Sequence, residues 1–81
     1  KMKLKQIASN MTELDINGSK VLFSYSTPVA GFHINDGNFK TTEKYSKTTT
    51  KHINKYFREE WGINPYSVME VDQTYIDGLV K

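Results

Sequence analysis

The segment Ser46–Trp61 most constrains how this chain can fold, because its residue spacing is that of one amphipathic helix with two separate stripes. At about 100° per residue, one side of this helix gathers apolar residues: Ile53, Tyr56, Phe57 and Trp61. Another side gathers basic residues within roughly 80° of one another: Lys47, Lys51, Lys55 and Arg58. The apolar stripe needs a hydrophobic surface to pack against, and the basic stripe is the surface feature that points to a partner.

Both ends of the predicted helix carry the expected signals. Ser46 or Thr48 can serve as the N-cap, because each has a hydroxyl that can accept a hydrogen bond from a free backbone N–H group. Gly62 directly follows Trp61, at the position where a left-handed residue commonly ends a helix. Pro65 then prevents the helix from continuing.

The first half of the chain is predicted to be β-rich, and Asn17-Gly18 is its strongest turn signal. Pairing outward from a two-residue turn here gives three pairs: Asp15 with Lys20, Leu14 with Val21, and Thr12 with Phe23. One face of the hairpin is then apolar: Leu14, Ile16, Val21, Phe23 and Tyr25. Leu22 falls on the opposite face and is therefore expected to be exposed or to form part of an interface.

Further strands are predicted on both sides of this hairpin. A second turn at Asp36-Gly37 would pair Ile34 with Phe39 and His33 with Lys40. Thr27-Pro28 should break or bulge the run between the two hairpins, since proline cannot donate to a strand ladder. Lys3–Ala8 is predicted to add an edge strand. Open edges of such a sheet, together with Leu22, favour a homodimer.

The tail from Asp72 to Val80 is predicted to form a short second helix, capped by Asp72 and burying Tyr75, Ile76 and Leu79. No linker or repeat divides the sequence, so residues 1–81 are predicted to form a single domain. The fold class is α+β: an antiparallel meander of three or four strands, packed against one amphipathic helix, with a short C-terminal helix.

The composition argues against several kinds of function. There is no cysteine for a disulfide or a thiolate, and the two histidines, His33 and His52, lie in different predicted elements. Glu59 and Glu60 are adjacent and project in different directions, which does not suit an acid–base pair. We therefore expect no metal, no cofactor and no enzymatic activity. The apolar runs are too short to span a bilayer, and the absence of cysteine favours a cytoplasmic protein.

The charge is distributed unevenly, with +5 from Lys40 to Arg58 and −4 from Glu59 to Lys81. The basic stripe can be read as a solvated helix face, as a surface for an acidic protein, or as a set of phosphate contacts. Nucleic-acid stacking is not favoured, because the helical phase turns Phe57 and Trp61 toward the core. Thr48-Thr49-Thr50 can likewise be read as capping residues or as hydroxyls that bind a phosphate at the helix N-terminus.

Three strings, LKQIASNMTEL at 4–14, VLFSYSTPVAGF at 21–32 and TTEKYSKTTTKHINKYF at 41–57, give the chain a resemblance over about residues 4–57. In this order they resemble a group of short, functionally uncharacterised proteins of tailed bacteriophages. The most specific part is the run from Tyr45 to Ile53. The resemblance implies a phage accessory protein in the host cytoplasm that binds host or phage macromolecules.

The sequence thus predicts a small phage-encoded binding protein without catalytic activity. Its partner is expected to be a host or phage protein, and inhibition of a host or defence function is one use of such binding. The predicted partner-binding residues are Lys47, Lys51, Lys55 and Arg58, with Leu22 as an interface residue. The alternative is a nucleic-acid-binding module that uses the same stripe on phosphates.

Overall fold

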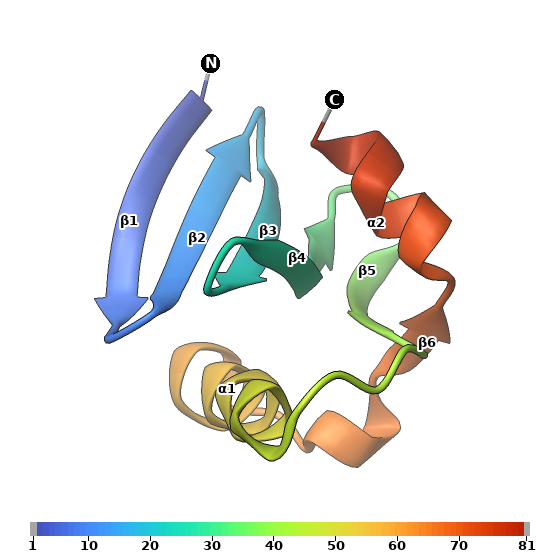
Figure 1. Cartoon of the computed structure of the whole chain (residues 1–81). Helices are drawn as coiled ribbons and strands as arrows, with labels where there is room; N and C mark the ends of the chain where they lie inside the picture. The colour runs from blue at the N-terminus through green and yellow to red at the C-terminus, as the bar shows by residue number, and fades with distance from the viewer. Residues whose placement is uncertain (1, 81) are drawn as a thin grey trace.

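A computed structural model of the chain, which describes residues 2–80, has an α+β architecture built on one mixed sheet (Figure 1). Its six strands lie in sequence order: β1 (Met2–Ala8), β2 (Met11–Ile16), β3 (Ser19–Ser24), β4 (Thr27–His33), β5 (Gly37–Thr41) and β6 (Met69–Val71). Neighbouring strands are antiparallel except for β5 and β6, which are parallel because the chain crosses over between them. The α+β class is confirmed, and the sheet has more strands than the three or four expected.

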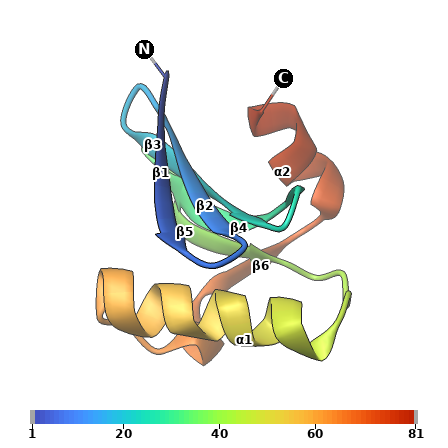
Figure 2. The ribbon, with the colours of Figure 1, turned by 60° about the vertical axis from the view of Figure 1, so that its left-hand side comes forward.

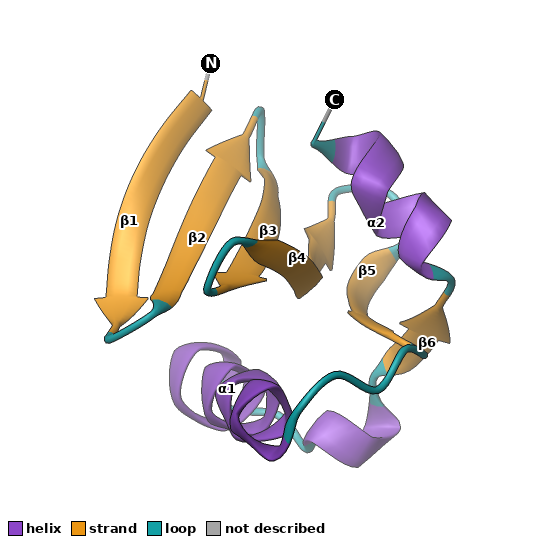
Figure 3. Cartoon of the chain, in the orientation of Figure 1, coloured by secondary structure: helices purple, strands orange, loops and turns teal. Residues whose placement is uncertain are grey.

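Three helical segments follow or connect these strands (Figure 3). The α-helix α1 (Lys47–Lys55) runs directly into the π-helix η1 (Tyr56–Trp61), and Gly62 ends the combined helix in a left-handed conformation. The short 3-10 helix η2 (Pro65–Ser67) precedes β6, and α2 (Gln73–Leu79) closes the chain. Within residues 2–80, no helix is long and apolar enough to cross a membrane.

The first hairpin has the predicted register. Asp15 pairs with Lys20 and Leu14 pairs with Val21 across a turn in which Asn17 and Gly18 both have positive φ. The predicted bulge near Pro28 is also present, because the register between β3 and β4 shifts by one residue there. The Lys3–Ala8 edge strand is confirmed as part of β1.

The second hairpin differs from the prediction. His33 pairs with Gly37, not with Lys40. Phe39 pairs with Gly31, whereas a two-residue turn would have paired it with Ile34. The connection is therefore a longer loop, and Gly37 follows it with a φ of 88°. This register places the Phe39 ring over a glycine, where the ring is fully buried. Burial of an aromatic side chain thus overrides the local preference of the Asp-Gly pair.

Both faces of the sheet are covered, each by a different helix (Figure 2). On one face, Leu22 and Met11 pack against the α1–η1 helix. On the other face, Val21 and Phe39 pack against Ile76 of α2. The predicted sheet had one apolar face, which carries Val21, for the amphipathic helix to cover; this is wrong, because α2 covers that face and α1 covers the other.

The prediction that Leu22 is exposed or part of an interface is also wrong, since its side chain is fully buried. It was based on a sheet with one covered face, whereas this sheet lies between two helices. The homodimer prediction loses that support, and the outer edges of β1 and β6 remain its only basis. Tyr25 likewise leaves the predicted apolar face, because it lies in the β3–β4 turn with a φ of 58°.

The C-terminal helix α2 is confirmed within Asp72–Val80, with Ile76 fully buried and Tyr75 and Leu79 half-buried. Asp72 occupies the N-cap position, but its side chain makes no capping hydrogen bond. In place of that bond, the Gln73 amide donates to the Pro28 carbonyl oxygen at 2.7 Å and thereby ties α2 to β4.

Substituting Gly31 by alanine should destabilise the fold strongly. A Cβ atom at this position would lie 2.0 Å from the Lys20 backbone oxygen and 3.0 Å from the Phe39 ring, so the strands would have to move. We expect Gly31→Ala to lower the free energy of unfolding by about 2 kcal/mol or more. Thermal and urea denaturation, followed by circular dichroism, measure this loss.

Gly78→Ala provides the matched control, because a Cβ atom there meets nothing within 4 Å. Alanine is favoured over glycine inside a helix by about 1 kcal/mol, so this variant should be slightly more stable than the parent protein. Equal stabilities of the two variants would contradict the close approach of β3 and β4.

Candidate functional site: a basic surface at the start of helix α1

Helix α1 begins at a well-defined cap, which fixes the position of the first basic residues. The Ser46 hydroxyl accepts a hydrogen bond from the Thr49 N–H at 3.1 Å, as expected for an N-cap serine. The Thr49 side chain is buried, and its hydroxyl contacts those of Ser24 and Ser46. The Thr50 hydroxyl donates to the Ser46 carbonyl oxygen. The interpretation as capping and packing residues therefore holds for Thr49 and Thr50, whose hydroxyls are already engaged at the helix start.

The four predicted binding residues are all exposed, but they divide into two groups. Lys55 lies 3.2 Å from a Glu59 carboxylate oxygen, four residues along the helix. Arg58 is in the π-helical segment beyond it. Lys47 and Lys51 form no ion pair with any residue in the range 2–80, so their charges are available to a partner.

Lys47 and Lys51 line a shallow hollow of about 420 Å³, together with Lys44, Tyr45, Ser46 and Thr50. A second hollow of about 250 Å³ adjoins it and shares Lys44 and Thr50. Lys40 and Tyr66 line this second hollow, as does one acidic residue, Glu70. We define the basic surface as the residues that give both hollows their charge and their aromatic character: Lys40, Lys44, Tyr45, Lys47, Lys51 and Tyr66.

Both tyrosines of the basic surface are open to solvent, with 48% of Tyr45 and 75% of Tyr66 exposed. Tyr66 sits in η2, whose first turn is capped by the Asn64 side chain. The Lys40 ammonium group lies 5.4 Å from the centre of the Tyr66 ring and donates to the Pro65 carbonyl oxygen at 2.8 Å. Lys40 and Tyr66 are therefore held together as a cation–π pair.

Acidic groups border this surface. Partial burial, followed by the negative charges of Glu43 and Asp77, raises the pKa of the Tyr45 hydroxyl. Glu70 lines the second hollow beside Lys40 and reduces the net positive charge there. Carboxylates therefore lie close to both hollows, which limits the extent of the positive region.

Sequence reasoning found Lys47 and Lys51 and missed the rest of the basic surface. Helical periodicity can assign residues only within one helix, whereas Lys44 and Tyr45 lie in the loop before α1, Lys40 lies in β5, and Tyr66 lies in η2. Their meeting depends on the crossover from β5 to β6, which the sequence did not predict.

A buried polar chain under α1 attaches the helix to the sheet. Ser46 donates to Thr49, whose hydroxyl lies 3.2 Å from that of Ser24, and the Ser24 hydroxyl lies 2.7 Å from Nδ1 of His52. With Ser46 as the first donor, each following hydroxyl donates onward and Nδ1 is the final acceptor. Burial lowers the pKa of His52, which keeps the ring neutral for this role.

The other histidine belongs to the end of the second hairpin. Nδ1 of His33 accepts a hydrogen bond from the Asn35 N–H and lies 3.6 Å from a carboxylate oxygen of Asp36. The Tyr75 hydroxyl donates to the same carboxylate oxygen, and burial together with this bond raises the pKa of Tyr75 to about 12. Neither histidine lines any of the three hollows described for this protein, and residues 2–80 contain no group of three potential metal ligands.

The geometry defines a small α+β domain whose helix N-terminus carries a short basic surface with two exposed tyrosines. The chain belongs to DUF8033, a protein family of unknown function whose model matches residues 2–74. No curated protein and no solved structure gives a significant match to the sequence.

The stability of the protein should fall as the pH is lowered through the ordinary histidine range, about 6.5 and below. Because the pKa of His52 is lower in the folded protein, the unfolded chain takes up a proton first, and this favours unfolding. Protonation of Nδ1 also removes the acceptor at the end of the hydroxyl chain. Thermal melts between about pH 5 and pH 8 should show this decline.

His52→Asn should flatten that pH dependence, because its amide oxygen can accept from Ser24 and does not titrate. His33→Asn is the matched control, because it replaces the other histidine without altering the hydroxyl chain under α1. A decline of the same size in the His52→Asn variant would contradict the role given to His52. The hydrogen bond from Lys20 lowers the pKa of Asp15. The contribution of Asp15 to stability is therefore lost only at a pH below the histidine range, and it does not affect this comparison.

Proposed function

We propose that this protein is a non-enzymatic binding protein whose basic surface holds an acidic segment of a partner protein. The observation that carries the proposal is the hollow beside Tyr45, where Lys44, Lys47 and Lys51 surround an aromatic side chain that is about half exposed. Lysines can attract carboxylates, while tyrosine offers apolar contact area together with a hydroxyl. Tyrosine is also one of the residues that most often contribute strongly to binding at protein interfaces.

The acidic border favours a short partner segment. A phosphodiester backbone carries a charge at every nucleotide, so a strand that extended past the hollows would meet Glu43, Glu70 or Asp77. A peptide with a few carboxylates near one apolar residue can end before it reaches them. In the setting implied by the phage resemblance, the partner is a host or phage protein in the host cytoplasm, and binding inhibits a host or defence function.

Single-stranded nucleic acid is the second candidate, and it has gained support from one observation. Nucleic-acid stacking was not favoured by the sequence because the helix aromatics face the core, but Tyr45 and Tyr66 are exposed next to lysines. Bases stack on aromatic side chains with a contribution of about 1–3 kcal/mol per base. This candidate predicts that both tyrosines and the lysines contribute to binding.

The test compares two labelled probes by fluorescence anisotropy: a short glutamate-rich peptide with one phenylalanine, and a short oligo(dT). The double variant Lys47→Glu/Lys51→Glu should weaken binding of the peptide by roughly tenfold or more, which corresponds to about 1.4 kcal/mol. The matched control, Lys55→Glu/Arg58→Glu, makes the same charge change on the same helix outside both hollows. It should have a much smaller effect.

Three outcomes decide between the candidates. Equal losses in the two double variants would mean that only the overall charge matters, and the basic surface would not be a site. Binding of oligo(dT) at about 50 mM salt, lost on Tyr45→Ala and Tyr66→Ala, would favour nucleic acid over an acidic peptide. If neither probe binds at this salt concentration, the proposed function is wrong.

A further inference from the structure

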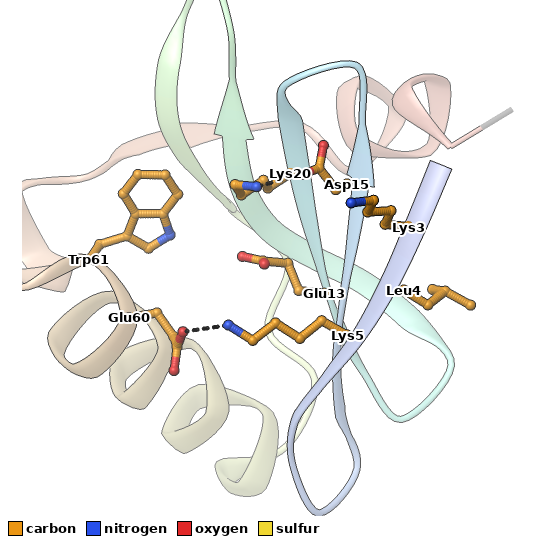
Figure 4. A pocket seen from close by; sticks show the side chains of 8 residues that line it. All are labelled: Lys3, Leu4, Lys5, Glu13, Asp15, Lys20, Glu60 and Trp61. Carbon is orange, nitrogen blue, oxygen red and sulfur yellow. Dashed lines mark hydrogen bonds and ion pairs between the residues drawn. The ribbon is translucent and has the colours of Figure 1, made fainter. Parts of the chain in front are cut away.

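A third hollow lies on a different part of the molecule, between strands β1–β3 and the last turn of η1 (Figure 4). It has a volume of about 350 Å³, which is within the usual range for small-molecule sites. It shares no residue with the basic surface. Three lysines and three carboxylates line it in equal numbers: Lys3, Lys5, Lys20, Glu13, Asp15 and Glu60.

Two ion pairs organise the charges around this hollow. Lys20 lies 2.7 Å from Asp15 across the β2–β3 hairpin, and Lys5 lies 3.7 Å from Glu60, which connects β1 to η1 (Figure 4). Lys3 is on the strand next to Asp15 and pairs with it in the β1–β2 register. With these pairs formed, an excess of positive charge remains near Lys3 and Lys20, and the Glu13 carboxylate supplies negative charge.

Glu13 occupies the floor of the hollow and is only 9% exposed. One of its carboxylate oxygens accepts a hydrogen bond from the Tyr56 hydroxyl at 2.6 Å. The other oxygen makes no hydrogen bond or ion pair with any residue between 2 and 80. A buried carboxylate with one unused oxygen favours a ligand that donates hydrogen bonds and carries positive charge.

The indole N–H of Trp61 is an unused donor on the opposite wall. Its nitrogen is buried and has no hydrogen-bond partner in the described part of the chain. Burial and the hydrogen bond to Glu13 raise the pKa of the Tyr56 hydroxyl. The indole N–H of Trp61 has the opposite effect on this pKa, although it does not meet the geometric criteria of a hydrogen bond. Figure 4 shows the indole nitrogen and the Glu13 carboxylate facing each other across the hollow. The Trp61 ring is held in place by stacking on Phe32 at 5.1 Å.

We propose that this hollow binds a small zwitterion, namely a free α-amino acid. Its ammonium group would donate to Glu13, and its carboxylate would accept from the Trp61 N–H and face Lys20. A simple anion would be attracted by Lys20 and repelled by Glu13, and a simple cation would be attracted by Glu13 and repelled by Lys20. A dipolar ligand can make a favourable contact with each of these groups. This proposal does not depend on the proposed function, because the two sites have no lining residue in common.

Trp61 is the single tryptophan of the chain, so the site carries its own reporter. The indole ¹H–¹⁵N resonance and the tryptophan fluorescence should change in a saturable way on titration with glycine, L-leucine or L-phenylalanine. The N-acetyl derivatives lack the ammonium group and the amino-acid amides lack the carboxylate. Both blocked forms should bind roughly tenfold more weakly or worse. No change with any free amino acid, or equal affinity for the blocked forms, would overturn the proposal.

Two variants assign the interaction to the proposed residues. Glu13→Gln keeps an oxygen that can accept from Tyr56 but removes the charge, and it should weaken binding by roughly tenfold. Lys55 does not line the hollow, so the control variant Lys55→Gln should bind normally. If Glu13→Gln does not fold, Trp61→Phe keeps a six-membered aromatic ring beside Phe32 and removes the pyrrole ring with its N–H, with backbone amide shifts in β1 and β2 as the readout. Unchanged affinity in the folded variant would overturn the proposal.

Discussion

Strand β3 has to be buried on both of its faces, and most of the architecture follows from this requirement. Val21 and Leu22 are adjacent and both fully buried, so they point to opposite sides of the sheet. One helix can cover only one of these sides. The chain therefore crosses one face as α1, adds β6 beside β5, and returns over the other face as α2. In a chain of 81 residues, this arrangement buries apolar side chains on both faces of one sheet. The two cores together compensate for the small size of each.

Sequence reasoning succeeded where structure is determined locally and was wrong where it depends on distant contacts. The Asn17-Gly18 hairpin, the Ser46 cap and the Gly62 terminus depend on backbone preferences of a few residues, and all three are as predicted. The second hairpin was wrong because its register depends on packing Phe39 over Gly31 and against α2. Leu22 was misplaced for a related reason, since alternation along a strand cannot show whether the second face is covered.

The candidate site could be predicted only in part for the same reason. Helical phase identifies Lys47 and Lys51, and it also groups Lys55 and Arg58 with them, although the hollows include neither. The remaining members of the basic surface come from three other elements that the crossover brings together. The exposed Tyr66 illustrates the limit: no local pattern shows that η2 places this ring outward beside Lys40.

The π-helical segment connects the fold to the charged hollow. In a regular α-helix of about 100° per residue, Trp61 would lie roughly 80° away from Ile53 around the axis. The wider π turn rotates it back, so that its ring stacks on Phe32 and lines the hollow, with the indole nitrogen buried and unpaired within residues 2–80. On the same segment, Tyr56 is fully buried and fixes Glu13 through a short hydrogen bond. Core packing therefore sets the positions of both facing groups before any ligand arrives. Such preorganisation reduces the cost of binding, and π-helical turns often occur at functional sites for this kind of reason.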